Sequence, residues 1–151
     1  FKSRIEEIRR KVPEISISTD VICAFPMETE EEFEITASNL EEIGFSFLHV
    51  FPYSRRKGTV ADAMKGHIDP RTAKERTARL LQLSETLRKK DMARFDSVEV
   101  LVEREDLHHP GIYTGYTKQY HPARIKSSVP LEGRVVISSP EIRDLAYCCN
   151  L

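Results

Sequence analysis

Apolar residues recur along the first 95 positions with the spacing of alternating helices and strands. Ile5, Ile8 and Val12 lie three and four positions apart, which predicts a helix with one apolar face. A strand is expected over residues 15–25, because its last five residues form an uninterrupted apolar run typical of a strand buried on both faces. Pro26 ends this strand, since proline has no N–H to donate to a sheet.

The next stretch predicts another helix, another strand and a long helix. Thr29 is followed three residues later by glutamate, the signature of a capping box, so we expect a helix over residues 30–43. Residues 45–51 are rich in phenylalanine and predict a second strand. Asp69-Pro70 has the residue types of a helix start, and the helix runs to about residue 95. This order predicts an α/β fold with a parallel sheet and right-handed crossovers.

Beyond residue 96 the pattern changes to short alternating strands. Val98, Val100 and Val102 alternate with other residues, which predicts a half-buried strand. Proline and glycine separate further expected strands over residues 112–117, 120–125, 133–138 and 144–149. Five short strands within about 55 residues favour a small barrel of the oligonucleotide/oligosaccharide-binding kind. We therefore predict an α/β domain over residues 1–96, followed by an all-β domain over residues 97–151.

The composition is that of a globular chain in a reducing compartment. Of its 151 residues, 40% are hydrophobic and 31% are charged, and the formal net charge is −1. No apolar run is long enough to span a bilayer, and there is no signal peptide. Three cysteines do not make a disulfide framework, so we expect a cytoplasmic protein. Because the chain begins at Phe1 inside a helical pattern, we expect it to be a piece of a longer protein.

The cysteines do not form a recognisable metal motif. Cys23 stands alone in an apolar strand and is typical of a buried structural thiol. Cys148 and Cys149 are adjacent, so they face opposite sides of a strand. Three histidines lie in the same half of the chain, at positions 108, 109 and 121, but no C-x-x-C pair accompanies them. We therefore predict no metal ligands.

Basic and aromatic residues mark two candidate RNA contacts. The first is the cluster of Arg55, Arg56 and Lys57, which follows Tyr53 at the end of a strand; a phosphate site and a solvated basic loop both fit it. The second is in the β-domain, where aromatic rings alternate with cations, as in surfaces that stack bases and hold a phosphate backbone. Its members are Tyr113, Tyr116, Lys118, Tyr120 and Arg124. Core tyrosines are the alternative there. The domain has six basic and seven acidic residues, so RNA would need a local patch.

Two stretches together resemble one enzyme family. Residues 19–33 read T-D-V-I-C-A-F-P-M-E-T-E-E-E-F, and residues 45–59 read F-S-F-L-H-V-F-P-Y-S-R-R-K-G-T. Both resemble strand–loop motifs of the radical S-adenosylmethionine (SAM) methylthiotransferases. The second is most similar to the branch that modifies threonylcarbamoyladenosine beside the tRNA anticodon. Residues 97–151 resemble the RNA-binding TRAM domain of the same enzymes.

This resemblance implies a fold and an activity. The chain would comprise the last strands and helices of a partial TIM-like radical SAM barrel, over residues 1–96, and an OB-like TRAM barrel. The parent enzyme would add a methylthio group to C2 of N6-threonylcarbamoyladenosine in tRNA, using SAM and two 4Fe-4S clusters. The cysteines that bind these clusters in the family are absent, so the fragment alone is expected to be inactive and to need the missing N-terminal part of the same protein.

The resemblance also assigns residues to roles. The expected cofactor-binding residues are Asp20, Ile22, Phe25, His49, Val50 and Phe51. For Ile22, Val50 and Phe51, ordinary barrel core is an equally open interpretation. The expected RNA-binding residues are Tyr53, Arg55, Arg56, Lys57, Tyr113, Tyr116, Lys118, Tyr120 and Arg124. No catalytic residue is expected in this part of the enzyme.

The sequence departs from the family pattern at two positions and leaves two other functions open. Ala24 and Met27 replace glycines, so a Cβ at residue 24 is expected to narrow the cofactor pocket, and residue 27 is expected in a turn that suits glycine. A non-catalytic RNA-binding module and a radical SAM enzyme of another substrate class are the alternatives. Because a partial barrel leaves a strand edge and a sheet face uncovered, we expect self-association or a rearranged first domain.

Overall fold

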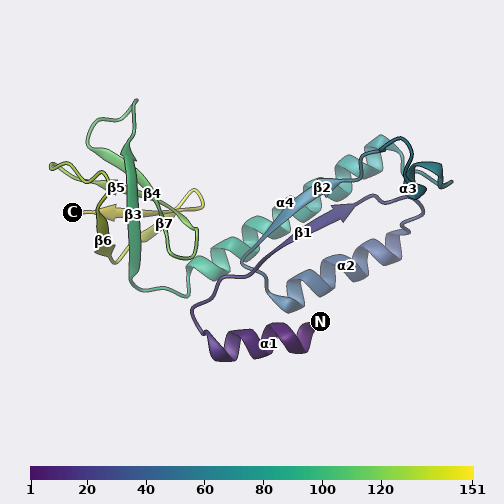
Figure 1. Cartoon of the computed structure of the whole chain (residues 1–151), viewed down its shortest axis with the longest axis horizontal. Helices are drawn as coiled ribbons and strands as arrows, with labels where there is room; N and C mark the ends of the chain where they lie inside the picture. Colours follow the sequence, from purple (N-terminus) through teal and green to yellow (C-terminus); the bar gives the residue numbers. More distant parts are fainter. The chain divides into compact units, whose positions relative to one another are not determined.

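The computed structural model describes all 151 residues, in two compact units (Figure 1). The first unit contains residues 1–11 and 16–88, and the second contains residues 12–15 and 89–151. Each unit has its own cluster of buried apolar side chains. The first is an α/β unit and the second is built on a curled mixed sheet.

The first unit follows the predicted order of helices and strands, with one short helix added. Its elements are α1 (Lys2–Lys11), β1 (Ser18–Cys23), α2 (Glu30–Ile43), β2 (Phe47–Pro52), α3 (Val60–Ala63) and α4 (Pro70–Met92). β1 and β2 pair in parallel, from Ser18 opposite Phe47 to Cys23 opposite Pro52. Helix α3 was not predicted, because four residues are too few to show a helical period. The predicted parallel sheet is therefore present as one pair of strands joined through α2.

Both ends of α2 are fixed by the residues that the sequence indicated. The Thr29 hydroxyl accepts a hydrogen bond from the Glu32 N–H, and the Glu32 carboxylate accepts one from the Thr29 N–H, which completes the capping box. Gly44 ends the helix with φ of 66°, in the left-handed conformation that glycine adopts without steric penalty. These caps explain why the predicted bounds of α2 agree with the observed ones.

One face of the β1–β2 pair is covered by helices and the other is not. Val21, Cys23 and Leu48 are buried together with apolar residues of α1, α2 and α4. Figure 1 shows α2 and α4 running alongside the two strands. On the opposite face, Ile22 and Phe51 lie side by side in the strand register and keep 59% and 52% of their surface exposed. The expectation of self-association rests on this uncovered face.

The second unit is a six-stranded mixed sheet. Its strands are β3 (Val98–Glu105), β4 (Ile112–Thr117), β5 (Pro122–Lys126), β6 (Val135–Ser138), β7 (Glu141–Arg143) and β8 (Ala146–Asn150), in the order β6-β3-β4-β5-β8-β7. Only β5 and β8 pair in parallel; the other neighbours are antiparallel. The strand expected over residues 144–149 corresponds to β8, which starts two residues later because Asp144 and Leu145 form a turn, and β7 before this turn was not predicted. The sheet therefore has six strands instead of five.

Candidate functional site

A pocket lies where the two parallel strands end. It has a volume of about 540 Å³ and is lined from β1, from β2 and from the loops that follow them. The lining residues are Asp20, Ile22, Phe25, Phe51, Pro52, Tyr53, Ser54, Arg56, Thr59 and Ala61. Because both strands run in the same direction, their carboxyl ends and following loops meet at one edge of the sheet, where α/β proteins bind ligands. The walls are mostly apolar and aromatic, with an acidic and a basic side chain among them.

The strand alternation decides which expected cofactor residues face this pocket. Asp20 pairs with His49, and Ile22 pairs with Phe51, so all four side chains belong to the uncovered face. Of these, His49 is exposed but is not among the lining residues. Val50 has the opposite orientation and packs against the core of the first unit. Its side chain is therefore core, and only its backbone is available to a ligand.

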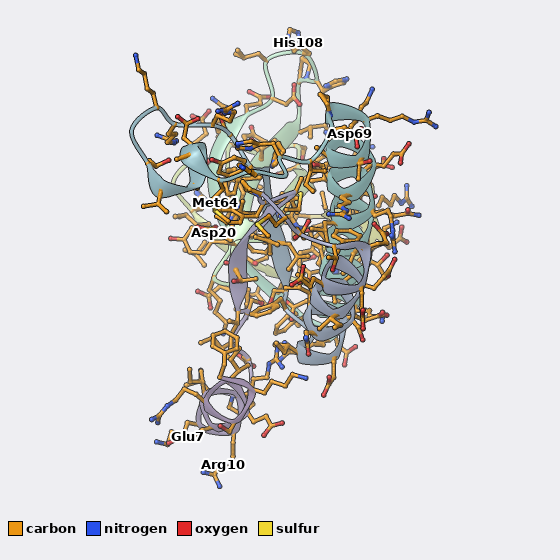
Figure 2. The ribbon with its side chains drawn as sticks, turned by 90° about the vertical axis from the view of Figure 1, so that its right-hand side faces the viewer. Glu7, Arg10, Asp20, Met64, Asp69 and His108 are labelled. Atoms are coloured by element: carbon orange, nitrogen blue, oxygen red, sulfur yellow. The ribbon has the colours of Figure 1, made fainter.

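The loop after β1 contains two left-handed residues that are not glycine. Ala24 has φ of 58° and Met27 has φ of 69°. These are the two positions at which the sequence differs from the family's glycines. Ala24 is buried and is not among the pocket-lining residues, so its Cβ does not narrow the pocket as expected. Figure 2 labels Asp20 on β1, the strand that this loop follows.

A buried ion pair holds this loop in place. Glu28 Oε2 accepts hydrogen bonds from the Ala24 N–H at 2.8 Å and from Arg76 Nη1 at 2.7 Å. Arg76 Nη1 also donates to the Glu28 carbonyl at 3.0 Å, and its Nη2 donates to Glu30 at 2.9 Å. Burial of the guanidinium lowers the pKa of Arg76, but its hydrogen bonds to Glu30 and Glu28 outweigh burial and raise the pKa overall. Sequence spacing gave no sign of Arg76, because it lies 48 positions along the chain from Glu28.

The basic cluster after β2 separates into three different environments. Arg55 is paired with Asp62 at 2.8 Å and also donates to the Asp62 carbonyl. Arg56 lines the pocket, and Lys57 is exposed in the turn before α3. Arg56 is therefore the member of the cluster that a pocket ligand would meet.

Aromatic contacts join the two loops at the pocket. The Tyr53 ring meets Phe25 edge-on at 5.2 Å and stacks on His67 at 6.0 Å between ring centres. The Tyr53 hydroxyl and His67 Nε2 are buried without a hydrogen-bond partner. His67 was missed by sequence reasoning, because a histidine in a loop between helices carries no pattern of its own.

The expected RNA residues of the β-domain are split between the surface and the core. Tyr116 and Arg124 are exposed and alternate with buried neighbours, so both lie on the uncovered face of the sheet. Lys118 and Tyr120 are exposed in the turn between β4 and β5, with 78% of Tyr120 accessible. Tyr113 is a core residue with 6% of its surface exposed, so its ring is not available for stacking.

No group of histidine, cysteine, aspartate or glutamate side chains is arranged to hold a metal ion. Cys23 and Cys149 are buried in different units, and Cys148 is half-buried. Burial raises the pKa of the Cys149 thiol. The three cysteines therefore do not converge on one site.

One buried polar cluster in the second unit was not foreseen. His121 Nε2 lies 2.8 Å from Asp91 Oδ2, and Arg94 donates to Asp91 Oδ1 at 2.6 Å. The Tyr147 hydroxyl donates to the Met92 carbonyl at 2.7 Å. These bonds join the end of α4 to the sheet of the second unit, so His121 has a structural partner in place of a metal.

No helix in the structure combines the length and the apolar character needed to cross a bilayer.

The chain is similar to several tRNA-modifying enzymes. It is 34% identical over 140 residues to the threonylcarbamoyladenosine tRNA methylthiotransferase MtaB of Bacillus subtilis (strain 168), which covers 90% of this chain and 31% of that protein. It is 37% identical over 138 residues to the tRNA-2-methylthio-N(6)-dimethylallyladenosine synthase of the same organism, covering 90% of this chain and 27% of that protein. The chain is homologous to the tRNA methylthiotransferases. The family resemblance read from the two strand–loop motifs is thereby confirmed.

The similarity to the tRNA methylthiotransferases concerns a limited part of each relative. The corresponding synthase of Geobacillus kaustophilus (strain HTA426) is 35% identical over 134 residues, which is 87% of this chain and 25% of that protein. The chain thus spans about a third or less of the length of the curated relatives it matches. No protein-family model matches it.

Proposed function

We propose that these residues form part of a radical SAM tRNA methylthiotransferase that acts in the cytoplasm. In this proposal the whole enzyme adds a methylthio group to C2 of N6-threonylcarbamoyladenosine next to the anticodon. The observation that carries it is 34–37% identity over about 90% of the chain to relatives whose names describe two such modifications. The choice of threonylcarbamoyladenosine is supported by the motif L-H-V-F-P-Y-S-x-R-x-G-T over residues 48–59.

In this proposal the pocket at the strand ends holds SAM. Its volume of about 540 Å³ lies within the range of small-molecule sites, and its walls are apolar and aromatic with few polar groups. Ile22, Phe25 and Phe51 would pack against an adenine ring, and Asp20 and Arg56 would meet polar ends of the ligand. When bound, SAM together with its cluster supplies the methyl and radical chemistry. The protein's own part is to orient the ligand and to exclude water from it.

The iron–sulfur clusters do not fit these residues. A cluster needs several cysteine thiolates, whereas the three cysteines here do not converge and no metal-holding group exists. We propose that the cluster ligands lie in a segment of the same polypeptide outside these 151 residues. The 151 residues alone are then inactive. Iron content and modification activity, measured on the 151 residues and on the complete gene product, test this division.

We propose that tRNA contacts both units. Residues 97–151 act as the TRAM domain, and Tyr116, Tyr120, Lys118 and Arg124 provide exposed rings and cations for bases and phosphates. In the first unit, Arg56 and Lys57 in the loop after β2 provide further cations for RNA phosphates. Arg55 contributes less, because its guanidinium is already paired with Asp62, and the same holds for Lys118, which is paired with Glu14 at 3.1 Å.

Nucleoside analysis of a strain lacking the gene tests the proposed reaction. We expect the 2-methylthio form of threonylcarbamoyladenosine to disappear from total tRNA digests and the 2-methylthio form of dimethylallyladenosine to remain. Loss of the second nucleoside in place of the first would assign the chain to the other reaction. Unchanged levels of both would reject the methylthiotransferase proposal. The coding sequence upstream should also contain C-x-x-x-C-x-x-C.

A non-catalytic RNA-binding module is the second candidate function. The exposed Tyr116, Tyr120 and Arg124, in a chain without a metal-holding group, favour it. Residues 97–151 carry no net excess of positive charge, so binding would come from a local patch. Titration of tRNA into the 151-residue chain at several salt concentrations tests this function. Affinity that falls steeply with salt supports phosphate contacts, and a flat dependence argues against them.

A further inference from the structure

We propose that Arg76, although outside the pocket, is the positioning residue that holds the pocket's Phe25 wall in place. This inference rests on the proposed function insofar as the pocket's ligand is SAM. Phe25 lies in the loop after β1, where Ala24 directly before it and Met27 two residues after it both have left-handed backbones. Such conformations are unfavourable for residues with a Cβ and persist only where surrounding contacts fix them. The contacts that fix this loop are therefore also those that place Phe25.

Those contacts converge on Glu28. Its carboxylate accepts the Ala24 N–H at 2.8 Å, and its own N–H donates to the Phe25 carbonyl at 3.0 Å. On the other side of the loop, the Met27 N–H donates to the Gly66 carbonyl at 2.8 Å. Glu28 thus closes the loop around Phe25 from within.

Arg76 is what fixes Glu28. It donates to both the carbonyl and the carboxylate of Glu28, at 3.0 and 2.7 Å, and only 5% of its surface is exposed. Its guanidinium also lies 5.2 Å from the centre of the Phe33 ring, which is fully buried. A planar guanidinium in contact with two oxygens of one residue sets orientation as well as distance. A change at Arg76 therefore reaches the pocket through Glu28, Ala24 and Phe25.

Arg79 provides a matched control one turn further along α4. Like Arg76, it pairs with Glu30, at 3.2 Å, and lies over the Phe33 ring, at 4.9 Å. Its second partner is Glu34, and no hydrogen bond or ion pair joins it to Glu28. Arg76→Gln and Arg79→Gln thus each remove one charge, an ion pair with Glu30 and a contact with the Phe33 ring, at a buried and at a half-exposed position respectively. Only the first also removes the contacts to Glu28 and so releases the loop.

The ligand-free test is amide hydrogen exchange in the 151-residue chain. We expect Arg76→Gln to speed exchange of the Ala24 amide about tenfold relative to the Val21 amide in β1. We also expect it to weaken the nuclear Overhauser effect between the ring protons of Phe25 and Tyr53. Arg79→Gln leaves both unchanged. If Arg76→Gln unfolds the unit, Arg76→Lys replaces it; lysine keeps the charge but not the planar fork, so a smaller increase in the same ratio is expected. The proposal would be overturned if the ratio of the Ala24 to the Val21 exchange rate were the same in the wild type and in both Arg76 variants. It would also be overturned if Arg79→Gln raised this ratio as much as Arg76→Gln does.

The second measurement is titration of the same proteins with SAM. We expect Arg76→Gln to weaken binding about tenfold or more, and Arg79→Gln to change it by less than about twofold. Equal affinity of wild type and Arg76→Gln would overturn the positioning role. A wild-type chain that does not bind SAM would instead refute the cofactor assigned under the proposed function. In that case the exchange ratio, which needs no ligand, is the measurement that tests the positioning role of Arg76.

Discussion

Met27 has the backbone of a glycine and a largely exposed side chain. Its φ is 69° and 64% of its surface is accessible, so little burial compensates the roughly 1–2 kcal/mol penalty of a left-handed L-residue. We expect Met27→Gly to raise the free energy of unfolding by about 0.5–1 kcal/mol, because relief of strain exceeds the added entropy of the unfolded chain. Urea unfolding measures the change. Met27→Ala keeps the Cβ, so it should give no gain; an equal gain in both variants would contradict the explanation.

Gly115 is required for a different reason, the close approach of two strands. A Cβ at this position would lie 2.1 Å from the Leu101 carbonyl oxygen, where the pairing of β3 and β4 shifts register between Val102 and Arg104. We expect Gly115→Ala to destabilise the second unit by about 3 kcal/mol, because backbone cannot move away as a side-chain end can. Thr114→Ala, on the same strand, is the control and should cost less than about 1 kcal/mol. Similar losses in both variants would disprove the steric argument.

At the level of elements, the turn between β7 and β8 occupies the first two residues of the strand predicted over residues 144–149, and β7 before it was not predicted. Asp144 and Leu145 have φ of 48° and 58°, the sign required at both central positions of a type I′ turn. Asparagine and glycine are the usual residues there, and neither is present, so the sequence carried no turn signal. We expect Asp144→Asn combined with Leu145→Gly to stabilise the chain by about 1 kcal/mol, measured by urea unfolding. Leu145→Ala removes the side chain without easing the backbone and should give no gain.

The start of α4 makes stability depend on pH in the acid range. The Asp69 carboxylate accepts hydrogen bonds from the N–H groups of Arg71 and Thr72, both at 3.0 Å. Hydrogen bonds from the side chain and backbone of Thr72 hold the pKa of Asp69 below its usual value. A folded-state pKa below the unfolded one stabilises at neutral pH, and this contribution disappears as pH falls through the folded pKa, below about 4. Asp69 is labelled at the start of its helix in Figure 2.

We therefore expect Asp69→Ala to lower the thermal midpoint at pH 7, and to lower it by less once Asp69 is protonated in the wild type, because the neutral acid keeps only an uncharged acceptor oxygen. Asp69→Asn preserves an oxygen for the same two N–H groups but does not titrate. Its thermal midpoint should therefore lack the part of the pH dependence that Asp69 contributes. A difference between wild type and Asp69→Ala that stays constant down to the acid limit would refute this account.

Helices with strong end signals were predictable, and contacts between distant segments were not. Residues 30–43 were placed correctly because capping residues mark the ends of that helix, and residues 112–117 because β-prone residues follow directly after Pro110-Gly111. The pocket edge was also foreseeable, since parallel strands bring their carboxyl ends together. Arg76 and the Asp91–His121 pair were not, because their partners lie tens of residues away and no periodicity links them.

At the scale of the whole molecule, each core contains one buried cysteine, and the alkylation rate of its thiol measures how often that core opens. Cys23 belongs to the cluster of the first unit and Cys149 to that of the second, and the two clusters share no residue. Leu80 is 1% exposed in the first core and Ile125 is fully buried in the second. Truncating such residues to alanine usually costs 2–5 kcal/mol. Local opening of a core raises the alkylation rate of its thiol in proportion to the opened population.

We therefore expect Leu80→Ala to speed alkylation of Cys23 by about a hundredfold and to leave Cys149 slow, and Ile125→Ala to do the reverse. A Cys148→Ser background removes the half-buried neighbouring thiol, and peptide mass spectrometry assigns the modified residue. The raised pKa of Cys149 slows its reaction in every variant equally, so rates are compared for one thiol at a time. If either substitution accelerates both thiols equally, the two cores open together and the chain is one cooperative unit. Separate responses would mean that the sheet of the second unit and the pocket-bearing first unit can be altered independently.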